Sequence, residues 1–186
     1  WPDRSGTGPP LSYPDFCAPW MVTSAVLAAL DYRRRTGQAQ YIEFSQLEAT
    51  MDFVPGHLLL QYTVNKEIPT RMGNRSPQAA PHEAYPCKGD DRWCAISVSN
   101  DEQWQALCKV MGNPSWTKDE KFSSFLARKQ NEEELDKLVA QWTINFSPHE
   151  LMEKLQAVGV PAGVVQHYGE LLEQDPQMKH RGFFVK

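Results

Sequence analysis

The chain has 186 residues, of which 41% are hydrophobic and 23% are charged, and its formal net charge is -4. This length suits one domain or a little more, and the composition is typical of a globular protein rather than a disordered chain. The acidic balance argues against a nucleic-acid partner, because binding to phosphates needs a basic surface. No apolar run approaches the roughly 20 residues of a membrane span.

The four cysteines, at positions 17, 87, 94 and 108, form neither a CxxC pair nor a metal-ligand spacing. We therefore expect four free thiols, a cytoplasmic location and no metal, although two disulfides are possible by number alone. The chain starts without Met in a Pro- and Gly-rich stretch (1–10) and stops at Lys186. Neither end has the features of a finished terminus, so we expect a piece of a longer protein.

The first helix is predicted over residues 19–35. Its apolar residues recur at helical spacing, Pro19 suits a first turn, and Gly37 suits a stop behind three arginines. Residues 41–45 alternate as a strand does, and a second helix with a kink at Pro55 is predicted after them. Asp15 stands just ahead of the first helix, where a carboxylate can be a simple cap.

The composition changes at Asn65, and the polar, Pro-containing segment 65–86 is predicted to be a linker and loop rather than a core element. A turn at 88–91 and a strand at 92–98 are predicted next. Capping residues and apolar spacing then predict helices at 101–111, 132–142 and 147–158. A strand at 160–165 and a short helix at 170–173 complete the pattern, which is that of an α/β or α+β chain.

Several short motifs follow one another along nearly the whole chain. They are Asp15 with the Arg-Thr-Gly37 exit, 40–45, 71–75, Tyr85-Pro-Cys87 with 91–93, 101–104, Gly159-Val-Pro-Ala-Gly163, and 175–178 with Arg181-Gly182. In this order they resemble the class III CoA-transferases, the CaiB/BaiF or formyl-CoA transferase-like family, whose members are considerably longer chains. The resemblance covers their middle and late parts.

The resemblance implies an α/β fold in which part of a nucleotide-fold-like large domain is joined to a small α+β domain. Residues 1–64 would belong to the large CoA-binding domain and carry the catalytic aspartate. Residues 65–86 would form the linker and active-site lid, 87–158 the small domain, and 159–186 the return toward the large domain. The family also implies an interlocked homodimer or a pair with a homologous subunit.

The activity implied by the resemblance is transfer of coenzyme A between an acyl-CoA thioester and a carboxylic acid acceptor. Asp15 matches the nucleophile, which would form a mixed anhydride and then an aspartyl-CoA thioester. Ser76, Pro77, Gln78 and Ala79 stand where formyl-CoA transferases carry a glycine run, and they are the expected substrate-binding lid. Without glycines the lid is expected to be stiffer and the acyl group bulkier than formyl or oxalyl, unless the segment is an ordinary surface loop.

Three residues are candidates for contacts with CoA. Gln46 matches a position beside CoA in the family, although the residue type differs, and Arg71 and Arg75 flank the lid. Arginines 33–35 could meet CoA phosphates, but a solvated helix end explains them better. His82 lies in the lid segment and is expected to be a solvated loop histidine rather than an acid or base.

Two other functions stay open at this point. An α-methylacyl-CoA racemase would share the scaffold but needs an acid/base pair, whose histidine the resemblance places upstream of this segment. The sequence Phe16-Cys-Ala-Pro19 after the aspartate favours a transferase, because racemases tend to be Gly-rich there. A non-catalytic remnant or assembly module is the third alternative, since the missing half would hold most of the CoA site.

Overall fold

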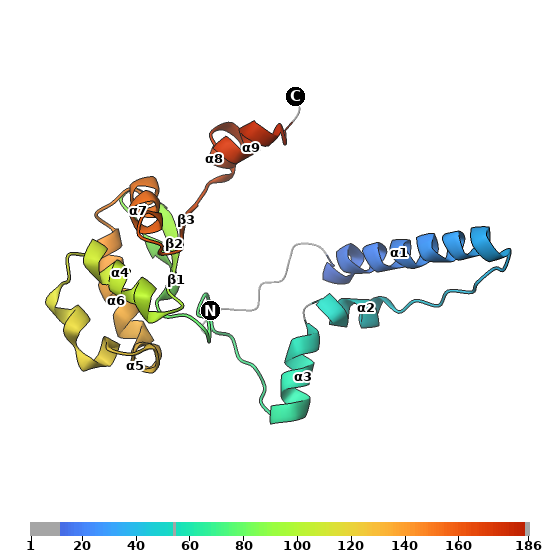
Figure 1. Ribbon diagram of the computed structural model, residues 1–186, viewed down its shortest axis with the longest axis horizontal. Helices are drawn as coiled ribbons and strands as arrows, with labels where there is room; N and C mark the ends of the chain where they lie inside the picture. Colours follow the sequence, from blue (N-terminus) through green and yellow to red (C-terminus); the bar gives the residue numbers. More distant parts are fainter. Residues whose placement is uncertain (1–11, 54, 185–186) are drawn as a thin grey trace. The chain divides into compact units, whose positions relative to one another are not determined.

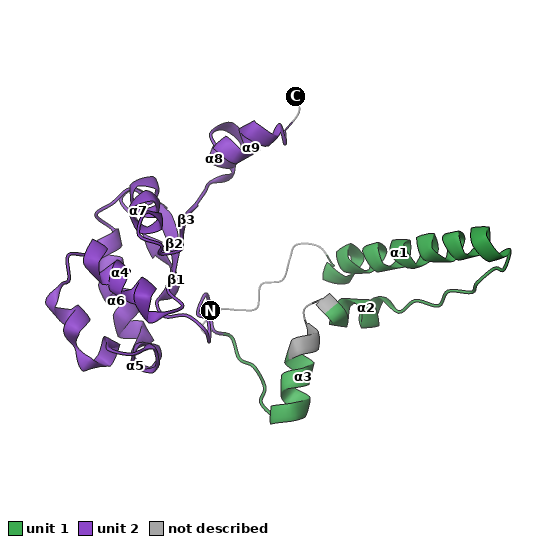
Figure 2. Cartoon of the chain, in the orientation of Figure 1, with its two compact units in different colours: residues 1–71 green, residues 72–186 purple. Residues whose placement is uncertain are grey.

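The computed structural model describes the backbone of residues 12–53 and 55–184, with side chains throughout except at 53 and 55–57. The sequence predictions for the Pro- and Gly-rich stretch before residue 12, for Val54 and for residues 185–186 lie outside these ranges. The chain forms two compact units, residues 1–71 and 72–186 (Figure 2). The division falls inside the segment 65–86 that was expected to link two domains.

Unit 1 begins with α1, a helix that runs from Tyr13 to Thr36 (Figure 1). The prediction that the helix starts at Pro19 is wrong, because Pro14 already occupies the first turn, where its missing N–H costs nothing. Pro19 lies inside the helix and cannot donate to the carbonyl of Asp15, four residues earlier. The predicted stop is confirmed, since Gly37 adopts φ 77° and its N–H reaches the Arg33 carbonyl at 2.8 Å.

Two shorter helices follow in unit 1, α2 over Gln46–Phe53 and α3 over Pro55–Asn65. The strand predicted at 41–45 is absent, and the described part of unit 1 contains no strand. A strand needs a neighbour to accept its backbone hydrogen bonds, and residues 12–53 and 55–71 offer none. Residues 37–45 form an irregular connection instead.

Helices α1 and α2 pack closely against each other (Figure 1). The buried side chains described in unit 1 are all small and lie within the first two turns of these helices: Cys17, Ala18, Ala49 and Thr50. Small side chains let two helix backbones approach, which fixes the relative position of their N-terminal turns. Asp15 and Gln46 lie one turn before this contact.

Unit 2 is built on a three-stranded antiparallel sheet of order β1-β2-β3. The strands are β1 over His82–Pro86, β2 over Trp93–Ser97 and β3 over Ala162–Val165. Tyr85 pairs with Cys94, and Ala95 pairs with Gly163. The interpretation of 65–86 as a loop throughout is therefore wrong at its end, because residues 82–86 supply a sheet strand, whereas the predicted strand at 92–98 is confirmed.

Helices cover one face of this sheet. The three main predicted helices are confirmed within a few residues as α4 (Asp101–Val110), α6 (Glu132–Thr143) and α7 (Pro148–Gln156). Asn100 and Ser147 accept hydrogen bonds from the helix starts, as their cap positions predict. The remaining short helices are η1 (Ser115–Lys118), η2 (Glu120–Phe122), α5 (Phe125–Gln130), α8 (Tyr168–Glu173) and α9 (Pro176–Arg181).

The core of unit 2 lies between the sheet and helices α4, α6 and α7. Its fully buried members include Tyr85, Cys94, Leu107, Leu135 and Leu151. All four cysteines are buried, and none is bridged to another. Among the described helices, none has both the length and the apolar character to span a membrane.

Candidate active site

Asp15 occupies the third position of α1, and its side chain is exposed. It is the acidic residue of the first helical turn, where the positive end of the helix dipole favours a carboxylate. Its backbone N–H is bonded to the Ser12 carbonyl at 3.0 Å, so the turn itself is well formed. No side-chain cap is present at Ser12. Asp15 is thus an accessible carboxylate on a defined helical turn.

Gln46 is the residue that the structure brings to Asp15. Its side-chain Nε2 donates to Asp15 Oδ1 at 2.5 Å, although the two residues are 31 positions apart. Gln46 opens α2, and its carbonyl accepts a hydrogen bond from Thr50 Oγ1 at 2.8 Å. Sequence reasoning proposed Gln46 only as a CoA contact and missed its pairing with the aspartate, since no local signal encodes a contact between two helices.

The four expected lid residues, 76–79, form a closed turn in unit 2. Ser76 and Ala79 make an isolated antiparallel bridge, and the Gln78 N–H donates to Ser76 Oγ at 3.1 Å. Pro77 and Gln78 are exposed at the tip, whereas Ala79 is buried. The turn therefore presents two side chains outward from a buried base.

Two basic side chains hold this turn to the body of unit 2. Lys129 Nζ donates to the Ser76 carbonyl at 2.7 Å, and Arg128 Nε donates to the Ala80 carbonyl at 3.1 Å. Arg128 is completely buried and also pairs with Asp101 at 2.8 Å and lies over the Trp104 ring. Neither anchor was predicted from the sequence, because α5 was not predicted.

The expected CoA-contact arginines have different surroundings. Arg75 lies in unit 2 beside two acids of α6, at 3.7 Å from Glu132 and 4.0 Å from Asp136. Burial raises the pKa of Asp136, which also accepts a hydrogen bond from Tyr85 at 2.6 Å. Arg71 is an exposed residue at the end of unit 1.

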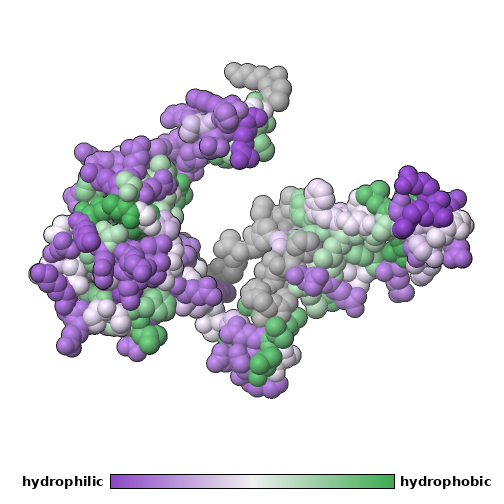
Figure 3. Space-filling view, viewed as in Figure 1, coloured by the Kyte–Doolittle hydropathy of each residue, from purple (hydrophilic) through white to green (hydrophobic). Residues whose placement is uncertain are grey.

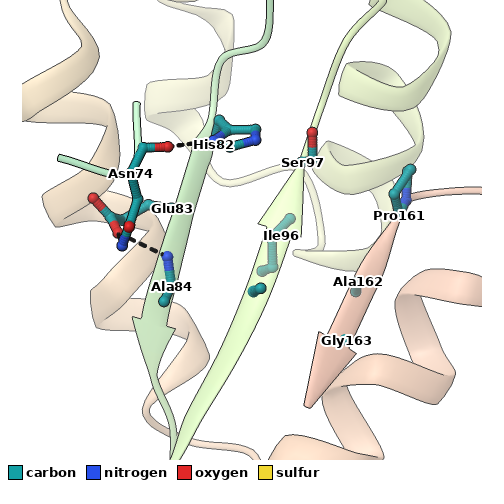
Figure 4. A pocket seen from close by; sticks show the side chains of 10 residues that line it. Asn74, His82, Glu83, Ala84, Ile96, Ser97, Pro161, Ala162 and Gly163 are labelled. Atoms are coloured by element: carbon teal, nitrogen blue, oxygen red, sulfur yellow. Dashed lines mark hydrogen bonds between the residues drawn. The ribbon is translucent and has the colours of Figure 1, made fainter. Parts of the chain in front are cut away.

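A hollow of ≈ 580 Å³ lies on the strands of unit 2 (Figure 4). His82, Glu83 and Asn74 line its polar side, and the rest is lined mostly by small residues of the three strands, together with Ile96 and Pro161. His82 Nδ1 lies 2.5 Å from the Asn74 carbonyl, and the Asn74 amide is hydrogen-bonded to Glu83. His82 is therefore a strand residue tied to the segment before the lid turn, rather than the solvated loop histidine that was expected.

Comparison with known proteins identifies the family to which this chain belongs. The family model described as CoA-transferase family III matches residues 1–186. The chain belongs to this family, as its motifs predict.

Individual relatives agree with this assignment. The chain is 33% identical over 172 residues to a probable CoA-transferase of Mycobacterium tuberculosis, covering 92% of this chain and 21% of that protein. It is 32% identical over 176 residues to the succinyl-CoA–D-citramalate CoA-transferase of Chloroflexus aurantiacus, covering 95% of this chain and 43% of the relative. The chain therefore spans less than half the length of these relatives.

A solved structure supports the fold assignment. The crystal structure of a CaiB/BaiF family protein from Brucella suis superimposes with a TM-score of 0.85 at 29% identity, covering 99% of this chain and 48% of that one. The prediction of an α/β fold of the family III type is confirmed. The missing strand partners of unit 1 are consistent with a chain that matches only part of this larger fold.

Proposed function

We propose that this chain carries the nucleophile of an enzyme that transfers coenzyme A between an acyl-CoA thioester and a carboxylic acid. The observation that carries the proposal is the exposed Asp15 carboxylate, held on the first turn of α1 by a neutral amide, in a chain of the CoA-transferase family. A neutral partner leaves the carboxylate its full negative charge, which a nucleophile needs.

The proposed reaction starts with attack of an Asp15 oxygen on the thioester carbonyl, which releases CoA thiolate and forms a mixed anhydride. The thiolate then attacks Cγ of Asp15, releases the first acid and forms an aspartyl-CoA thioester. The acceptor carboxylate attacks Cγ in turn and displaces the thiolate. Attack of the thiolate on the acceptor acyl carbon completes the new thioester and regenerates Asp15. The anhydride is as activated as the thioester it replaces, so one hard displacement becomes several easier steps.

We infer that the acyl groups are larger than formyl. The lid turn has Pro77 and Ala79 rather than glycines, and its base is buried and anchored. Such a turn supports the expectation of a stiff lid that does not close over a very small acyl group. The Chloroflexus relative is named for succinyl-CoA and D-citramalate, and we extend a dicarboxylic acyl class to this protein by that similarity.

We also propose that activity requires more chain than these residues. Arg71 and Arg75 remain candidates for CoA contact, and a complete CoA site would need chain from the rest of the protein or from a second subunit. An interlocked homodimer or a pair with a homologous subunit would supply that chain. The helices of unit 1 expose large apolar residues, such as Trp20 at 75%, which supports further packing there.

The experiment that tests this function is mass spectrometry of the full-length protein incubated with succinyl-CoA. We expect CoA mass on the peptide that contains Asp15, and Asp15→Ala should abolish both the adduct and turnover. Asp31→Ala is the matched control, since Asp31 is another acid of α1 and pairs only with neighbouring arginines on that helix in the described contacts. An adduct at another residue, or one that survives in Asp15→Ala, would exclude the proposed nucleophile.

A further inference from the structure

The hydrogen bond between Gln46 and Asp15 makes the two carboxylate oxygens unequal. Oδ1 accepts from Gln46 Nε2 at 2.5 Å, whereas no described residue donates a hydrogen bond to Oδ2. Two sets of contacts fix the position of Gln46. The Thr50 hydroxyl donates a hydrogen bond to the Gln46 carbonyl, and the buried Ala49 and Thr50 pack α2 against α1. The amide is thus placed before any substrate arrives.

A donor at this position has a use beyond orienting the carboxylate. In the proposed reaction two of the attacks, by CoA thiolate on the anhydride and by the acceptor acid on the thioester, occur at Cγ of Asp15. Each attack converts the carbonyl Cγ=Oδ1 into a tetrahedral Cγ–Oδ1 oxyanion. Donors preorganised toward such an oxygen stabilise the transition state, and loss of one costs about 100- to 1,000-fold in rate.

We propose that Gln46 is the oxyanion donor for the steps at Cγ of Asp15, rather than a residue that binds CoA. This inference rests on the proposed function of Asp15. Oδ2, which has no described donor, forms the new bond to the acyl carbon, and Oδ1 stays the carbonyl oxygen on Gln46. When the thiolate attacks Cγ, the electron pair moves onto Oδ1. Collapse of the oxyanion re-forms Cγ=Oδ1 and breaks the Cγ–Oδ2 bond, so Oδ2 leaves with the first acid.

Kinetics of the full-length protein separate this role from CoA binding. Gln46→Met keeps the length of the side chain but removes the N–H donor. We expect kcat with succinyl-CoA and succinate, a degenerate exchange followed with labelled succinate, to fall about 100-fold with KM for succinyl-CoA unchanged. Gln61→Met is the matched control, because Gln61 of α3 also donates from its amide to a carboxylate, Glu67 at 3.4 Å, away from Asp15. It should keep native rates.

A second variant supplies a readout that loss of packing would not produce. In Gln46→Glu the new carboxyl, with an ordinary pKa of about 4.3, donates to Oδ1 only when it is protonated. The measured step is discharge of the isolated aspartyl-CoA adduct by succinate, in which Asp15 itself no longer titrates. We expect a deficit of about 100-fold at pH 7.5 that narrows to about tenfold at pH 5, whereas Gln46→Met shows the same deficit at both pH values.

The outcomes distinguish failure of the proposed function from failure of the role inferred for Gln46. Absence of any CoA adduct on Asp15 in the native protein would remove the proposed function and this inference with it. An adduct that forms and discharges at native rates in Gln46→Met would overturn the inference alone. A raised KM with unchanged kcat would also overturn it, by showing that Gln46 binds CoA. A deficit in Gln46→Glu that does not change with pH would exclude the donor role in the same way.

Discussion

Units 1 and 2 contain similar helices but differ in what those helices bury. In unit 2 the apolar faces of α4, α6 and α7 close over a sheet, and residues such as Leu107, Leu135 and Leu151 are completely buried. In unit 1 the buried side chains described are small, while Trp20, Leu27 and Leu60 are mostly exposed. Figure 3 shows green hydrophobic surface along α1 and α3. The contrast shows that the sequence can specify helices in unit 1 without burying their large apolar side chains within the described residues.

The largest expected effect comes from separating the units. A fragment of residues 72–184 should unfold in one cooperative thermal transition, because its core is internal. A fragment of residues 12–71 should show little helix by circular dichroism and no cooperative transition, since isolated helices without packing are marginal in water. A cooperative transition in the shorter fragment would mean that unit 1 is stable by itself and would remove the contrast.

A pair of arginine substitutions sharpens the same comparison. Arg128→Met in unit 2 removes the donor from the Ala80 and Phe122 carbonyls in a completely buried site, and we expect a loss of about 3 kcal/mol in the free energy of unfolding. Arg34→Met in unit 1 removes only an exposed pair with Asp31, so the free energy from the urea transition should stay within about 0.3 kcal/mol of the native value. Urea unfolding of the whole chain measures both. Equal losses would contradict the assignment of Arg128 as a structural anchor.

A further expected effect appears only at alkaline pH and involves the buried thiols of unit 2. Burial raises the pKa of the Cys94 thiol to about 12 and that of Cys108 to about 11, from 9.0. The unfolded chain loses these protons first, so their contribution to stability is complete below pH 9 and declines as the pH rises toward the folded values. Each raised thiol should remove up to about 1.4 kcal/mol per pH unit in this window.

The control for the alkaline prediction is Cys94→Ala in the fragment 72–184. The substitution lowers stability at pH 7 by leaving a small cavity, but it should make the decline between pH 9 and pH 11 shallower. Unfolding in urea at several pH values measures both the stability at pH 7 and the slope of the decline. An unchanged slope in Cys94→Ala would show that the thiol is not the titrating group.

The difference between the units also explains which features could be predicted from the sequence. Caps and apolar spacing are local, so Asn100 and Ser147 gave correct helix starts in unit 2. The prediction of a strand at 41–45 was wrong because the described residues contain no neighbouring strand to accept its hydrogen bonds. The predicted start of α1 was wrong because both Pro14 and Pro19 suit a first helical turn, and it is Pro14 that occupies this turn.

The candidate site likewise combines a feature that could be predicted from the sequence with contacts that could not. Asp15 could be proposed as the nucleophile from ordered motifs, which are a property of the sequence. Its contact with Gln46 depends on how α1 packs against α2, over a separation of 31 residues, and no pattern within either helix encodes it. The anchors of the lid turn, Arg128 and Lys129, were missed for the same physical reason, since they act from a helix that is far along the chain.

The anchored lid turn has a thermodynamic consequence for binding. Fixing the backbone of a loop residue costs about 1 to 2 kcal/mol of conformational entropy. Lys129 and Arg128 hold the Ser76 and Ala80 carbonyls, so unit 2 meets that cost when it folds. A ligand that contacts Pro77 or Gln78 then meets a turn that is already ordered, and more of its contact energy is expressed as affinity.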